Sequence, residues 1–163
     1  MMISNKTQYK LLKVAFLINF VILIPLIFRK KPIKDWIIVY LFNAVTNEII
    51  DKIVLRYRVV KYPIRLFPKV FKTHILFDLF IYPTFTIFYN QITYKDKLFP
   101  KMYKLLLITI PPFLIELCAE RKTELIKWTK KWKWYYSFLS IIIKSFTTRM
   151  FIDLLRWSEK KIN

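Results

Sequence analysis

Five apolar blocks alternate with clusters of basic residues along the chain, and this alternation constrains the fold more than any other feature. The blocks cover about residues 10–29, 36–55, 75–90, 102–119 and 135–156. A helix of about 20 apolar residues crosses the hydrocarbon layer of a bilayer. Basic clusters between such spans are typical of a polytopic membrane protein whose loops lie on anionic lipid. We therefore expect one all-α domain, residues 1–163, forming a transmembrane bundle of four to five helices.

The charge of the chain supports a lipid partner rather than a nucleic acid. In a soluble protein a net charge of +19 would point to nucleic acid. Here the mean hydropathy is +0.33, and the basic residues are spread between apolar blocks. We expect anionic phospholipid as the partner, with a second copy of the chain or another membrane protein as further candidates, and no nucleic acid.

The chain contains no glycine, which removes many functional motifs. The P-loop, the GxGxxG turn, the GxSxG elbow and the GxxxG membrane dimer motif all require it. A single histidine and a single cysteine exclude Cys/His zinc sites and an intrachain disulfide. We expect no cofactor, no metal centre and no catalytic residue. With only three alanines as well, the helices should pack through large apolar side chains and polar seams.

Loop charge predicts the topology of a five-span bundle. The N-terminus and the second and fourth connections carry more Lys and Arg than the other three segments. The positive-inside rule then places the N-terminus in the cytoplasm and the C-terminus outside. If the polar second block is a re-entrant or surface helix, the C-terminus returns to the cytoplasm, and this alternative stays open.

Two linkers, residues 54–72 and 123–134, are predicted to lie on the bilayer surface because each mixes basic and apolar side chains. Arg65 stands between Pro63 and Pro68, which fix its backbone. The guanidinium of Arg65 suits a lipid phosphate or a buried carboxylate. The alternative is that Arg65 belongs to an ordinary basic interfacial loop. The linker residues that we expect to contact lipid headgroups are Arg65, Lys69, Lys72, Trp128, Lys130, Lys131 and Trp132. The tryptophans lie at the edges of the blocks and are expected in aromatic belts, namely Trp36, Trp128, Trp132, Trp134 and Trp157.

The second block carries polar residues on one helical face. Asn43, Asn47 and Asp51 follow one another at a spacing of four, and Glu48 and Lys52 form a second such pair. The face could line a cavity or a coupling-ion site. An interhelical hydrogen-bond seam is the favoured interpretation, since such seams are common in membrane bundles.

Two further pairs stand at the ends of apolar blocks. His74 and Asp78 open the third block, where they could relay protons or simply pair with each other at the surface. Glu116 and Glu120 close the fourth block. They could hold a cation, although a plain ion pair with a nearby Arg or Lys, such as Arg121, Lys122 or Arg149, is slightly favoured.

The last block contains Lys144, Arg149 and Asp153. Arg149 and Asp153 are four residues apart and should neutralise each other within the helix. Lys144 has no such partner, so we expect it to face Asp51, Asp78 or Glu116 of another span.

The segments YPIRLFP (62–68), YNQITY (89–94), ERKTELIKW (120–128) and WKWYYSF (132–138), with Asp78, Pro83 and Glu116, occur in a specific order. In this the chain resembles an uncharacterised family of small multi-spanning membrane proteins of spore-forming Firmicutes such as Bacillus and Clostridium. The resemblance covers roughly residues 32 to 156 and implies a bacterial cytoplasmic-membrane protein of four to five helices. It assigns no chemistry to the positions that match the family pattern, which are Asp51, Arg65, Asp78, Asn90, Gln91, Glu116 and Thr123.

Three functions remain, and the arrangement of the acidic residues distinguishes them. The first is an accessory or structural membrane component, in which a basic residue closes off each acid. The second is a small transporter or ion-pathway protein, in which Asp51, Asp78 and Glu116 meet at one cavity with Lys144 or Arg149 as counter-charge. The third is a lipid-modifying enzyme, in which the acids gather with Arg65 at the headgroup level.

Overall fold

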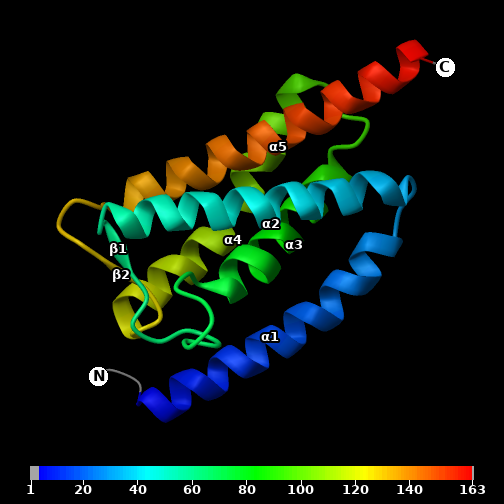
Figure 1. Ribbon diagram of the computed structural model, residues 1–163. Coiled ribbons are helices and arrows are strands. Elements are labelled where there is room, and N and C mark those ends of the chain that lie inside the picture. Colours follow the sequence, from blue (N-terminus) through cyan, green and yellow to red (C-terminus); the bar gives the residue numbers. More distant parts are fainter. Residues whose placement is uncertain (1–3, 163) are drawn as a thin grey trace.

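The computed structural model describes residues 4–162 and is helical almost throughout (Figure 1). Its elements are α1 (Asn5–Phe28), α2 (Ile33–Arg56), β1 (Val60–Lys61), the π-helix η1 (Leu76–Ile81), α3 (Tyr82–Ile92), α4 (Leu98–Lys122), β2 (Lys127–Trp128) and α5 (Trp134–Ile162). The all-α prediction is confirmed, and each apolar block lies within helix. Two helices, α1 and α4, are long and apolar enough to cross a membrane.

Local sequence explains where two of the helices begin. Ser4 precedes α1, and its hydroxyl accepts a hydrogen bond from the amide of Thr7, which satisfies a free donor of the first turn. Pro83 lies in the first turn of α3 and has no amide hydrogen to donate to the preceding turn. Directly before it the chain forms the wider turn of η1, so the third block is one continuous but irregular helical segment.

The bundle exposes a large apolar surface and buries many polar side chains beside its two apolar clusters. On α2 the exposed side chains include Leu41, Val45, Ile49 and Ile53, each four residues after the last. The buried face of the same helix carries Asn43 and Asn47. Other helices repeat this arrangement. Exposed residues include Val21, Ile110, Ile143 and Leu154, and buried ones include Thr86, Asn90, Gln91, Thr109 and Thr148.

The second and fourth connections meet at one end of the bundle, beside the start of α1 (Figure 1). Val60 pairs with Trp128 and Lys61 with Lys127 in a two-stranded antiparallel ladder. The amide of Glu124 donates to the Gln8 side chain at 2.7 Å. The linkers were predicted to lie on a membrane surface, and the structure adds that they pair with each other. They hold each other and cap the bundle because their backbone groups pair between the two loops.

Two hydrogen bonds at the opposite end of the bundle hold the connection between α1 and α2. Gln91 of α3 donates to the carbonyl of Leu26 at 2.6 Å, which satisfies an orphan carbonyl in the last turn of α1. The indole of Trp36 donates to the carbonyl of Lys30 at 2.6 Å. Trp36 is fully buried, so its expected place in an aromatic belt was wrong. A belt residue keeps one edge in the headgroup layer, whereas this indole is needed inside.

Candidate functional site

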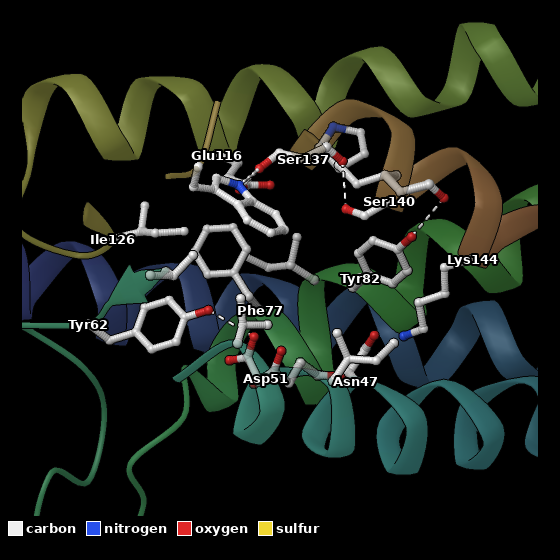
Figure 2. Close-up of a pocket in the computed structure, with 18 residues that line it drawn as sticks. Asn47, Asp51, Tyr62, Phe77, Tyr82, Glu116, Ile126, Ser137, Ser140 and Lys144 are labelled. Atoms are coloured by element: carbon white, nitrogen blue, oxygen red, sulfur yellow. Dashed lines mark hydrogen bonds between the residues drawn. The ribbon is translucent and has the colours of Figure 1, made fainter. Parts of the chain in front are cut away.

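A cavity of about 160 Å³ lies between α2, η1, α4 and α5, beneath the two loops (Figure 2). Its polar lining comes from elements far apart in the chain, namely Asn47, Asp51, Tyr62, Asp78, Glu116, Ser137, Ser140 and Lys144. Its apolar walls include Phe77, Ile81, Tyr82, Ile126, Trp132 and Ile141. The three acids that the sequence singled out as possible partners of Lys144 therefore all line one cavity with it.

Asp51 lies on α2, about 7 Å along the helix from its end at Arg56. Its Oδ1 accepts a 2.8 Å hydrogen bond from the hydroxyl of Tyr62, and its Oδ2 accepts a long one, 3.5 Å, from the amide of His74. Both ends of the second connection are thus tied to one carboxyl group. Burial and the neighbouring charge of Asp51 raise the pKa of Tyr62, so the phenol stays protonated and remains a donor.

Asp78 lies in the π-helix η1 and is only 8% exposed. Its carboxyl group lines the same cavity as that of Asp51. No donor among the described residues reaches its buried Oδ2. The side chain of Asn47 donates to the backbone carbonyl of Asp78 at 2.7 Å, which fixes η1 against α2. Irregular π-turns are frequent at functional sites because they reorient single side chains.

Glu116 approaches the cavity from α4, on the side opposite α2 (Figure 2). Its Oε1 accepts a 2.6 Å hydrogen bond from Ser137 and a 3.3 Å one from the indole of Trp128. Among the described residues it forms no ion pair with Arg121, Lys122 or Arg149, so that expectation was wrong. Neutral donors from β2 and α5 reach it instead. Glu120 does not line the cavity, because the next turn of α4 carries it toward the end of the helix.

Lys144 of α5 lines the cavity, and its side chain extends toward α2 (Figure 2). Its Nζ lies 4.7 Å from the centre of the Tyr82 ring and 3.5 Å from the carbonyl oxygen of Asn43. It has no ion pair with a carboxylate among the described residues. The prediction that it faces acids of other helices is confirmed at the level of the cavity, although no direct contact is made.

His74 and Arg65 differ from their predicted roles. His74 is 1% exposed, and its ring packs edge-on against Tyr62 and Phe77 rather than pairing with Asp78. Burial lowers the pKa of His74 to about 4. Arg65 donates to the carbonyls of Tyr62 and Phe71 at 2.9 and 2.8 Å, so its guanidinium holds its own loop together. Arg65 does not line the cavity. Its bonds within the loop account for its position without a bound phosphate or carboxylate.

The remaining predicted residues lie outside the cavity. Asn43 accepts a 3.4 Å hydrogen bond from Thr148 of α5, an interhelical contact of the kind expected in a seam. Glu48 pairs with Lys52 at 3.2 Å, as its spacing indicated. Arg149 and Asp153 also pair as expected, at 2.6 Å, in a separate network at the opposite end of the bundle.

The headgroup-contact residues divide into two groups. Lys69, Lys72, Lys130 and Lys131 are exposed at the loop end, where a lipid surface could reach them. Trp128 and Trp132 turn inward, where Trp132 donates to Ser137 at 2.8 Å. Their expected headgroup role was wrong because both indoles serve the Glu116 hydrogen-bond network.

Sequence reasoning did not identify Tyr62 or Ser137 as site residues, and it assigned Trp128 and Trp132 to lipid headgroups rather than to this hydrogen-bond network. Of these residues, Tyr62 could have been recognised from the sequence, because it directly precedes Pro63 in the most sharply constrained loop. Within residues 4–162, no three His, Cys, Asp or Glu side chains are grouped closely enough to hold a metal ion. No protein-family model matches the chain, and no curated protein or solved structure is significantly similar to it.

Proposed function

We propose that the chain is a multi-pass protein of the bacterial cytoplasmic membrane whose bundle spans the bilayer five times. The distribution of side chains supports this, since Leu41 and Val45 of α2 are 54% and 58% exposed while Asn43 between them is fully buried. Lipid is the solvent that favours an apolar exterior and tolerates a hydrogen-bonded polar interior. Charges such as Glu48 and Asp51 lower the mean hydropathy of α2, yet its outward stripe is apolar.

The proposed orientation puts the loop end in the cytoplasm. That end carries exposed Lys69, Lys72, Lys130 and Lys131, which would lie against anionic phospholipid. The N-terminus is on this side and the C-terminus on the other, in keeping with the positive-inside rule.

Within the membrane, the protein acts as a small ion-pathway protein or transporter that exchanges a proton for a cation at the cavity. One observation carries this proposal: Asp51, Asp78, Glu116 and Lys144 come from four different helical segments and line the same cavity. An acid buried beside other acids favours a bound proton, and a cation entering the cavity would favour release of that proton.

The geometry supports this function better than the two others. For an accessory protein, each acid should be closed off by a basic residue, but the described residues supply none for these three acids. For a lipid-modifying enzyme, Arg65 should join the acids, but it is bound to carbonyls of its own loop.

Proton-cation exchange is testable in liposomes that contain the purified protein and an internal pH dye. Inward gradients of sodium, potassium and ethylammonium are imposed one at a time, and the rate in protein-free liposomes is subtracted. At least one gradient should drive protons out and raise the internal pH. Asp78→Asn should abolish this protein-dependent rate, while Glu120→Gln, an acid outside the cavity, should retain it. A parent protein that gives no rate above protein-free liposomes for any cation would contradict the proposal.

A further inference from the structure

The charges lining the cavity do not cancel. Its lining contains three carboxyl groups, those of Asp51, Asp78 and Glu116, and one ammonium group, that of Lys144. The acidic groups therefore outnumber the basic one in a buried cavity, where an uncompensated charge is costly. The Oδ2 of Asp78 also has no hydrogen-bond partner among the described residues. A cation that donates hydrogen bonds would supply one.

The walls of the cavity favour an organic cation over a metal ion. Metal ions such as Mg²⁺ or Ca²⁺ require about six or more oxygen ligands. In the part of the chain that the structure describes, the acids are too dispersed to provide a metal site. Between Glu116 and the aspartate pair lie aromatic and aliphatic side chains, among them Phe77 and Tyr82. Aromatic faces attract ammonium groups that carry apolar substituents.

Lys144 is an example of the kind of cation that the cavity accommodates. Its side chain is a primary alkylammonium, and its Nζ lies over the ring of Tyr82 at 4.7 Å. The buried Oδ2 of Asp78 lacks a donor among the described residues, and a primary ammonium has three N–H donors to offer. A quaternary ammonium has no N–H group and cannot donate a hydrogen bond to this oxygen.

The cavity also reaches the outer surface of the bundle. Ile50 of α2 and Ser140 of α5 both line it, and both are exposed. This opening faces sideways between two helices, so it would admit a ligand from the surrounding lipid as well as from water.

We propose that the cavity binds a primary alkylammonium group, held between Glu116 and the Asp51–Asp78 pair in competition with the ammonium of Lys144. A free small amine and the headgroup of an aminophospholipid share this chemistry. The inference rests on the proposed function and specifies the cation that the site takes.

Calorimetric titration of the purified protein in nanodiscs without aminophospholipid tests the inference. Ethylammonium chloride should give saturable binding, and tetramethylammonium chloride should give none at matched ionic strength. Asp78→Asn should weaken ethylammonium binding by about tenfold or more, whereas Glu120→Gln should leave it unchanged. Lys144→Met removes the internal competitor and should strengthen the binding several-fold, a gain that loss of folding cannot produce.

The outcomes separate this inference from the proposed function. If sodium or potassium drives proton exchange but ethylammonium does not bind, the alkylammonium inference is overturned and the exchange function stands. Equal binding of tetramethylammonium also overturns it, as does Lys144→Met with unchanged or weaker affinity. Repeating the titration in nanodiscs with phosphatidylethanolamine identifies the source, since competition by the lipid indicates a headgroup ligand and undiminished binding indicates a free amine.

Discussion

The hydroxyl of Tyr62 donates a 2.8 Å hydrogen bond to Asp51, so the loop after β1 is tied to α2 at the edge of the cavity. Tyr62→Phe removes this donor and keeps the ring. We expect the variant to lose about 1–2 kcal/mol of unfolding free energy, because a buried carboxyl oxygen loses its partner. Thermal unfolding of the purified protein in detergent measures the loss. Tyr57→Phe, at an exposed tyrosine (72%), is the control and should behave as the parent. An unchanged midpoint for Tyr62→Phe would contradict the prediction.

Burial of His74 makes the protein less stable as the pH falls. Burial lowers its folded-state pKa to about 4, while the imidazole of an unfolded chain titrates near 6.5. Between these values the unfolded state binds more protons, so the unfolding free energy falls as the pH is lowered from about 6.5 to 4. At about pH 5 the loss is on the order of 2 kcal/mol.

His74→Phe keeps an aromatic ring against Tyr62 and Phe77 and removes the titration. Thermal unfolding of parent and variant is compared at about pH 7.5 and about pH 5. Carboxyl groups titrate in both proteins, so the difference between the two proteins reports His74. The variant should lose less stability than the parent on acidification. Equal losses would mean that His74 is not buried in its neutral form.

Arg149 is fully buried at the end of the bundle opposite the loops. It donates to the carbonyls of Thr93 and Tyr94 at 3.0 and 3.3 Å and pairs with Asp153 at 2.6 Å. We expect Arg149→Met to destabilise the protein by about 3 kcal/mol or more, because it leaves two buried carbonyls without this donor and removes one of the partners of the Asp153 carboxylate, which keeps Lys101. Arg29→Met, at an exposed arginine, should change the unfolding midpoint little. If both variants unfold at the same temperature as the parent, this network does not stabilise the fold.

The sequence was sufficient to predict contacts within single helices. The pairs Arg149–Asp153 and Glu48–Lys52 follow from a spacing of four, because such residues lie on one helical face. The helices themselves follow from the apolar blocks. An unpaired Lys144 within its own helix also correctly indicated acids on other helices.

Contacts between distant segments could not be predicted in the same way. Glu116 has Arg121 and Lys122 near it in the sequence, but its partners are Ser137 and Trp128. Trp128 reaches it from β2, which pairs with β1, and Ser137 reaches it from α5, which packs against α4. A two-residue strand leaves no periodic signal, so neither this ladder nor the hydrogen bonds that depend on it can be read from one sequence.

The proposed orientation predicts which ends of the bundle are reached from outside the cell. In a Cys118→Ser background, Lys130→Cys and Lys160→Cys place single thiols at exposed positions of the loop end and near the C-terminus. With the loop end in the cytoplasm, a membrane-impermeant maleimide should label only Lys160→Cys in intact cells and both variants after permeabilisation. The reverse pattern would invert the orientation, and labelling of both in intact cells would remove one span. Leu41→Cys, on the apolar stripe of α2, should react only after denaturation in detergent, because lipid excludes the reagent there. Labelling of Leu41→Cys in native membranes would exclude α2 from the spanning helices.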